Sequence, residues 1–180
     1  MRRIRLLACS IAMSLTLNAC AQSNPPAQPV ASAEPARAMP SQAGTLKVRP
    51  IASGLEHPWA VALLPDGGFL VTERPGRLRR IAGDGRVSAP ITGVPTVFAE
   101  GQGGLLDVVL DPAFASNRRI WMSFAEPGEG DTAGTAVATA TLGDVALSDV
   151  QVIYRQLPKV EGGNHCGSRI AFDGIGGKSG

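Results

Sequence analysis

From residue 45 onward, the chain alternates short apolar runs with turns rich in glycine, proline and aspartate. The runs are roughly four to seven residues long, as strands are, and none sustains the 3.6-residue period of an amphipathic helix. The pattern predicts an all-β domain over residues 45–180. We expect strands near residues 46–52, 59–65, 67–73, 76–82, 104–112, 119–127, 135–142 and 149–156, with another opening at residue 168.

Groups of consecutive strands recur about every 40–50 residues, which is typical of propeller blades made of four-stranded antiparallel sheets. A single β-sandwich is the alternative, because the period alone does not exclude it. Closure of a propeller needs at least four blades of about 40–45 residues, and residues 45–180 hold roughly three at most. We therefore expect an incomplete propeller of about two to three blades.

The N-terminus has the pattern of an export signal. "MRRIR" is basic, "LLACSIAMSLTL" is apolar but too short to span a bilayer, and "LNAC" follows. "LNAC" resembles a bacterial lipobox with Cys20 as the lipidated residue; an ordinary signal cut after Ala19 or Ala21 is the alternative. We expect a signal peptide at residues 1–19 and a lipidated, flexible tether rich in Pro, Ala and Ser at residues 20–44. The predicted location is the periplasm, with a lipid anchor in the outer membrane as the membrane contact.

Charge and cysteine content narrow the class of protein. The formal charge is +2, but without Arg2, Arg3 and Arg5 of the signal there are 14 basic and 15 acidic residues. No basic stripe remains, so nucleic acid is not an expected partner. Cys166 is the cysteine left in the folded part, which predicts a domain without an internal disulfide.

Two glycine-flanked polar segments are the candidates for chemistry. Gln102 lies in "EGQGGLL", and Asn164 and His165 lie in "EGGNHCGSRI", each just before an apolar run. Imidazole is a suitable general base for a hydroxyl, and a carboxamide can hold that hydroxyl by directed hydrogen bonds. The residues alone leave a catalytic and a structural His165 equally open, whereas His57, next to Pro58, is expected to be structural. The spacings of phosphate loops, dinucleotide sites and zinc sites are absent.

Three segments together resemble a known family. They are "GLEHPWAVALLPDGGFLVTERPGRLRRI", "GQGGLLDVVLDPAFASNRRIWMSFAEP" and "GGNHCGSRIAF". In this order they are similar to the soluble PQQ-dependent sugar dehydrogenases, the glucose/sorbosone dehydrogenase family, and most of all to its aldose sugar dehydrogenase branch. The resemblance implies a six-bladed β-propeller that carries pyrroloquinoline quinone (PQQ) and Ca²⁺. It further implies oxidation of the C1 hydroxyl of an aldose sugar to the lactone, with hydride passing to the quinone.

The resemblance also implies roles for individual residues. His165 matches the family's general base, Gln102 matches a polar residue beside substrate and cofactor, and Asn164 matches a cofactor-contacting position. The Ca²⁺ ligands and the cations that hold the PQQ carboxylates are expected in later blades, so none is predicted here. The chain is therefore expected to be a truncated and inactive form. The alternatives are a non-catalytic propeller lipoprotein and a calcium-dependent propeller lactonase or hydrolase.

One geometric expectation supports the catalytic interpretation. Gln102 and His165 should rise side by side from neighbouring sheets onto a common rim, with the imidazole open to solvent.

Overall fold

The computed structural model of the protein describes residues 37–42 and 44–173. The predicted signal peptide (residues 1–19), the predicted lipidation site Cys20 and most of the predicted tether lie outside the described residues. Within the described part, no helix has the length and apolar character needed to cross a membrane. Its elements are β1 (Arg37–Ser41), β2 (Gly44–Val48), β3 (Pro58–Leu63), β4 (Phe69–Glu73), β5 (Arg77–Ile81), β6 (Leu105–Leu110), α1 (Phe114–Asn117), β7 (Arg119–Pro127), β8 (Thr132–Leu142), β9 (Leu147–Arg155) and β10 (Val160–Glu161).

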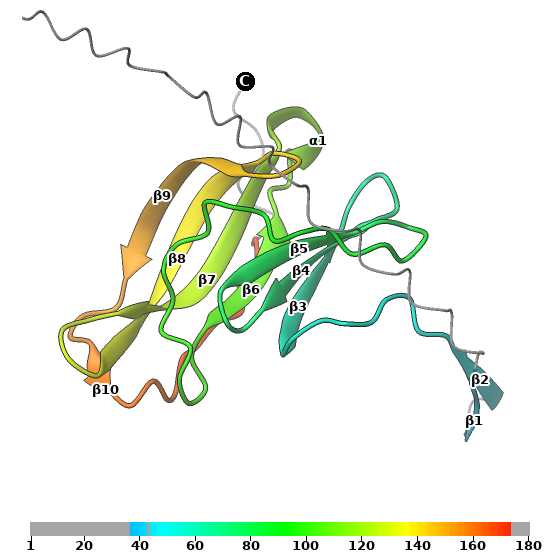
Figure 1. The fold of residues 1–180 in the computed structure, drawn as a ribbon, viewed down its shortest axis with the longest axis horizontal. Coiled ribbons are helices and arrows are strands. Elements are labelled where there is room, and N and C mark those ends of the chain that lie inside the picture. The colour runs from blue at the N-terminus through cyan, green and yellow to red at the C-terminus, as the bar shows by residue number, and fades with distance from the viewer. Residues whose placement is uncertain (1–36, 43, 174–180) are drawn as a thin grey trace, which may run out of the picture.

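Two antiparallel sheets form the body of the molecule (Figure 1). The first has the order β3-β4-β5. In the second, β6, β7, β8 and β9 follow one another, and β10 pairs with the start of β8. This arrangement confirms the predicted all-β fold of antiparallel sheets. The strand boundaries also agree well, since β7 coincides with the predicted strand at residues 119–127.

The first sheet shows why the alternating pattern predicts strands correctly. In β3, Ala60 and Ala62 are buried, whereas Val61 and Leu63 on the opposite face are 61% and 71% exposed. Successive side chains of a strand point to opposite faces, so one face of β3 enters the core and the other does not.

The first sheet has three strands where four were predicted. The segment after β5 meets it only at two isolated bridges, Leu78 with Ile91 and Ile81 with Val87. Pro90 lies between the two bridges and has no backbone N–H to give to a strand ladder. The fourth strand of this sheet is therefore reduced to two contacts.

The core lies between the two sheets. The buried faces of β3 and β4 pack against β6, and large side chains such as Leu105, Met122 and Phe124 fill the space behind it. In β8 the inward positions are Ala136, Ala138 and Ala140, all at most 1% exposed. Small side chains at these positions leave room for the larger groups, as close packing of an interior requires.

Two segments differ from their sequence predictions. Residues 37–48 form the β1–β2 hairpin, which includes the end of the predicted tether and lies apart from the two sheets in Figure 1. Residues 168–173, predicted to open a strand, have no regular secondary structure. Side chains of the second sheet, rather than a neighbouring strand, satisfy part of the backbone of this last segment.

Candidate functional site

Gln102 and His165 are in direct contact at one end of the second sheet. The side-chain oxygen Oε1 of Gln102 accepts a hydrogen bond from the backbone N–H of His165, at 3.1 Å. Both residues are exposed. The expected proximity is therefore confirmed, but with a difference in placement: Gln102 precedes β6 and His165 follows β10, so both loops flank the same sheet rather than two neighbouring ones.

Arg74 holds the Gln102 loop from the first sheet. Its guanidinium donates from Nε to the carbonyl of Gly103, at 3.0 Å, and from Nη2 to the carbonyl of Gly101. Its own carbonyl accepts the N–H of Leu105 at 3.0 Å. A Cβ on Gly104 would lie 2.2 Å from that carbonyl oxygen, which is why this position is glycine. The sequence analysis missed Arg74, although an arginine directly after a buried strand was a usable signal.

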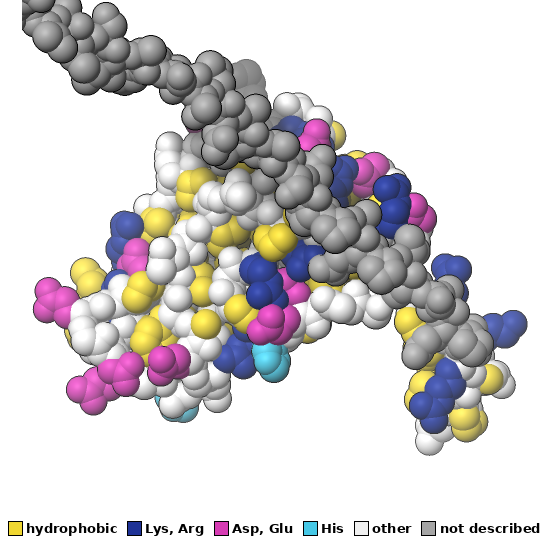
Figure 2. Space-filling view, viewed as in Figure 1, with side chains coloured by type: hydrophobic (Ala, Val, Ile, Leu, Met, Phe, Trp, Pro, Cys, Tyr) yellow, Lys and Arg dark blue, Asp and Glu magenta, His cyan; other side chains and the backbone are white. Residues whose placement is uncertain are grey.

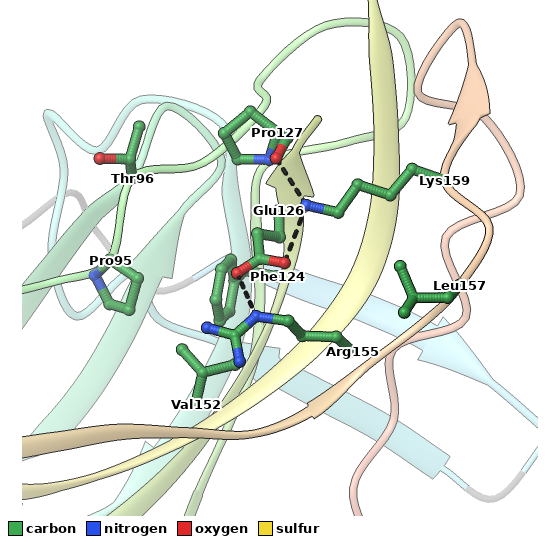
Figure 3. A pocket seen from close by; sticks show the side chains of 9 residues that line it. All are labelled: Pro95, Thr96, Phe124, Glu126, Pro127, Val152, Arg155, Leu157 and Lys159. Carbon is green, nitrogen blue, oxygen red and sulfur yellow. Dashed lines mark hydrogen bonds and ion pairs between the residues drawn. The ribbon is translucent and has the colours of Figure 1, made fainter. Parts of the chain in front are cut away.

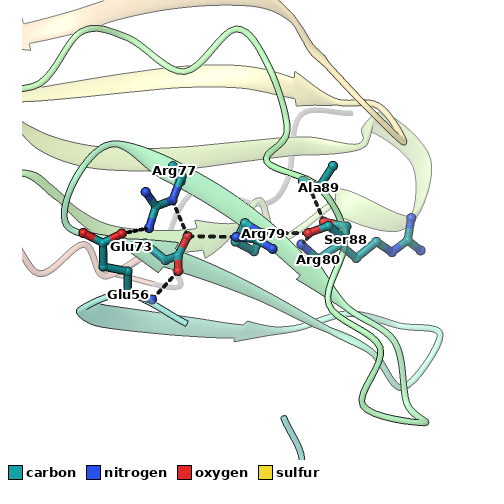
Figure 4. A network of polar contacts seen from close by, with 7 residues as sticks. All are labelled: Glu56, Glu73, Arg77, Arg79, Arg80, Ser88 and Ala89. Carbon is teal, nitrogen blue, oxygen red and sulfur yellow. Dashed lines mark hydrogen bonds and ion pairs between the residues drawn. The ribbon is translucent and has the colours of Figure 1, made fainter. Parts of the chain in front are cut away.

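A buried acid stands behind Arg74. Glu73, at the end of β4, is fully buried and accepts hydrogen bonds from Arg77 Nε at 2.8 Å and Arg79 Nη1 at 3.3 Å (Figure 4). The backbone N–H of Glu56 donates to its other oxygen. Burial opposes ionisation, but the hydrogen bonds from Arg77 and Glu56 and the two arginine charges outweigh it and lower the pKa of Glu73. Arg79 is itself tied to the carbonyl of Ser88.

The histidine loop follows a tight path. His165 has a backbone φ of 58°, in the left-handed region that side chains other than glycine rarely adopt. Gly163 has a φ of 55°, and a Cβ there would lie 2.5 Å from the ring of Phe98. A Cβ on Gly101 would lie 2.9 Å from Oδ1 of Asn164, so the two predicted loops also approach each other at this point. The glycines let the loops close on each other while His165 stays exposed.

His57 has the structural place that the sequence predicts. It lies in the turn before β3 with a φ of 46°, and its carbonyl accepts the N–H of Arg74 at 3.1 Å. The Gln102 loop is thus linked through Arg74 to the His57 turn. Figure 2 shows histidine side chains at the lower edge of the molecule, where acidic and basic groups are interspersed.

The three predicted site residues offer complementary chemistry. Gln102 uses its oxygen on the backbone of His165, which leaves its NH₂ group as the donor toward a ligand. The imidazole of His165 is exposed and able to accept a proton, and Asn164 beside it adds a second carboxamide. This donor set suits a hydroxylated substrate and the carbonyl edge of a quinone such as PQQ.

Groups that would bind the charged parts of the cofactor are not part of this set. Arg74, the nearest arginine in these contacts, is engaged with loop carbonyls. Among residues 37–42 and 44–173, no three or more His, Cys, Asp or Glu side chains gather as a metal site would require. Binding of Ca²⁺ by ligands of later blades remains a prediction.

A crevice of about 430 Å³ lies nearby, between β7, β9 and the loop at residues 95–96 (Figure 3). None of the three predicted site residues lines it. Glu126 lies inside, paired with Arg155 Nε at 2.8 Å and Lys159 Nζ at 2.9 Å. Burial opposes its ionisation, but Lys159 and Arg155 outweigh burial and lower the pKa of Glu126. The carboxylate is therefore a structural link between β7 and the chain that leads to the histidine loop.

Comparisons with known proteins bear directly on this site. The sequence profile of a family described as glucose/sorbosone dehydrogenase matches residues 55–177. Aldose sugar dehydrogenase YliI of Escherichia coli K12 is 50% identical over 135 residues, which cover 73% of this chain and 36% of the relative.

Solved structures agree. A glucose dehydrogenase structure is 57% identical with a TM-score of 0.64, covering 67% of this chain and 38% of its own. The PQQ-bound form of aldose sugar dehydrogenase from Streptomyces coelicolor is 26% identical with a TM-score of 0.54, covering 62% of this chain and 34% of its own. These structural neighbours are propellers, which confirms the predicted fold class. The chain spans about a third of the length of these proteins.

Proposed function

Since this chain belongs to the glucose/sorbosone dehydrogenase family, we propose that it is the N-terminal part of a PQQ-dependent aldose dehydrogenase. The proposed reaction oxidises the C1 hydroxyl of an aldose sugar to the lactone. The observation that supports it best is the hydrogen bond between Gln102 and the backbone of His165. This bond joins the two residues that match the family's reactive positions, although 63 residues separate them in the chain.

In the proposed reaction each residue acts on a defined atom. His165 removes the proton of the C1 hydroxyl, because its exposed imidazole is a base near neutral pH. The Gln102 NH₂ group holds that oxygen, and Asn164 contacts the cofactor. Bound PQQ supplies the hydride acceptor. The left-handed backbone of His165 directs the ring outward from a loop whose glycines leave no side chains in the way.

The name of one structural neighbour supports PQQ as the cofactor. Calcium, with ligands in later blades, is part of the same proposal. So are export to the periplasm and attachment to the outer membrane through a lipid on Cys20. The substrate class is a small sugar, as the names of the relatives imply for those proteins.

A dye-reduction assay tests the proposal. Purified chain is mixed with PQQ, Ca²⁺ and glucose, and reduction of an artificial electron acceptor is followed. We expect no turnover by the 180-residue chain and turnover by a longer chain that carries the remaining blades. In that longer chain His165→Ala should lower kcat by about 10²–10⁴-fold, the usual contribution of a general base. His57→Ala is the matched control and should retain activity.

Other outcomes contradict the proposal. Full activity of His165→Ala in the longer chain removes the histidine from the reaction. A longer chain that hydrolyses lactones without reducing the dye supports the calcium-dependent hydrolase. A longer chain that binds PQQ but turns over no sugar supports a non-catalytic binding protein.

A further inference from the structure

The chain that follows His165 is bound to the second sheet by two polar side chains. Asp107 Oδ2 accepts the backbone N–H of Ile170 at 2.8 Å, and Asp107 Oδ1 accepts from Arg169 Nη1 at 3.1 Å. On the adjacent strand, the hydroxyl of Ser123 donates to the carbonyl of Ser168 and accepts the N–H of Asp107. Three consecutive residues are thus held at one place on β6 and β7.

Asp107 is an unusual residue for its position. It lies inside β6, in the apolar run "LLDVVL", and its side chain is only 5% exposed. The pairing of β6 with β7 is irregular between Leu105 and Val108, so the ladder is interrupted at this acid. Bulges of this kind redirect side chains and often lie next to functional sites. A buried carboxylate is costly unless charge and hydrogen bonds satisfy it, and the segment after His165 supplies both.

Arg169 adds a second attachment. Its guanidinium lies over the ring of Trp59 in β3, 4.4 Å from the centroid, so the segment touches both sheets. Cation–π contacts of this geometry stabilise the arrangement of both partners.

His165 therefore lies between two anchors that belong to the same strand and its approach. Gln102, three residues before β6, holds the N–H of His165, and Asp107, within β6, holds residues 169 and 170. The left-handed backbone at His165 is unfavourable for a side chain and persists only when the surroundings enforce it. We propose that Asp107 is a positioning residue that holds His165 in this conformation, and so aims the imidazole at the substrate.

This inference rests on the proposed function for the meaning of the imidazole, but its test does not. The alternative is that Asp107 only fastens the end of the described chain. The two differ in one observable: positioning requires that the backbone of His165 changes when Asp107 is removed, whereas simple fastening affects residues 168–170 alone.

Nuclear magnetic resonance on the ¹⁵N,¹³C-labelled 180-residue chain measures both. For Asp107→Ala we expect amide exchange at Ile170 to rise about 10–100-fold, as loss of a hydrogen bond to a charged acceptor predicts. The backbone couplings of His165, which report the sign of φ, should move away from their left-handed values. Asp107→Asn keeps one acceptor oxygen and should give intermediate changes. It also serves if the alanine variant does not fold.

Asp111→Ala is the matched control. Asp111 follows β6 and also accepts three hydrogen bonds, from Ala113 N–H, Asn117 Nδ2 and Trp121 Nε1. Its loss should lower thermal stability without changing the couplings of His165. Unchanged His165 couplings in Asp107→Ala, with or without faster exchange at Ile170, overturn the proposal. So does an equal change in Asp111→Ala. Neither readout involves PQQ, so a failed dye assay contradicts the proposed function while this test still decides the role of Asp107.

Discussion

Replacing Glu73 by Gln should destabilise the fold more than any exposed ion pair can. The Glu73 carboxylate has no exposed surface, and its partner Arg79 is 11% exposed. Gln retains one acceptor oxygen but places an NH₂ group against the arginines and removes the charge that compensates them. Breaking a buried ion pair by removing one partner costs about 3–5 kcal/mol.

That cost is large against the stability of a whole domain, which is about 5–15 kcal/mol. For a folded unit of about 130 residues, the entropy of unfolding is about 0.3 kcal/mol per kelvin, so Tm should fall by about 10–17 °C. The measurement is thermal unfolding followed by circular dichroism at pH 7. The exposed pair Asp84–Arg86 provides the control, because Asp84→Asn should leave Tm almost unchanged.

The pH dependence gives a second check with a defined sign. The pKa of Glu73 is lowered in the folded state, so ionisation of Glu73 stabilises the fold above the ordinary carboxyl pKa of about 4.3. This stabilisation is lost as the pH falls through the lower, folded-state pKa. The difference in stability between the wild type and Glu73→Gln should therefore be full at neutral pH and shrink in acid. A Tm for Glu73→Gln within a few degrees of that of Asp84→Asn would refute the reasoning.

Two further predictions concern the loop and the anchor. Gly163→Ala should lower the free energy of unfolding by about 1–3 kcal/mol, because the residue has a φ of 55° and its Cβ would meet Phe98 at 2.5 Å; Gly167→Ala, with nothing within 4 Å, should be nearly neutral by the same urea titration. Cys20→Ser should abolish incorporation of radiolabelled palmitate in cells and release the protein from the membrane fraction, and retained label would contradict the lipid anchor.

The strands of this protein could largely be predicted from the sequence, because each has a local cause. Alternation in β3 and continuous apolar runs in β6 and β7 are properties of neighbouring residues. The prediction failed where pairing depended on distant residues. The fourth strand of the first sheet is interrupted at Pro90, and residues 168–173 are held by side chains of Asp107 and Ser123 instead of a strand.

The candidate site divides in the same way. Gln102, Asn164 and His165 are visible in the sequence, because polar residues between glycines stand out against apolar strands and match a family pattern. The residues that hold them are not visible in this way. Arg74 reaches the Gln102 loop across 27 residues of sequence, and Asp107 reaches Arg169 across 62.

By itself, the sequence determined which segments become strands, which face of each is buried and which polar side chains stand at the loop tips. These properties follow from periodicity and backbone preferences, which act over a few residues. Only the tertiary structure decided that one carboxamide meets the backbone of one histidine, and that an acid inside β6 holds the chain beyond it. Such contacts join residues far apart in sequence, and they form only after the sheets have packed and excluded water from Asp107 and Glu73.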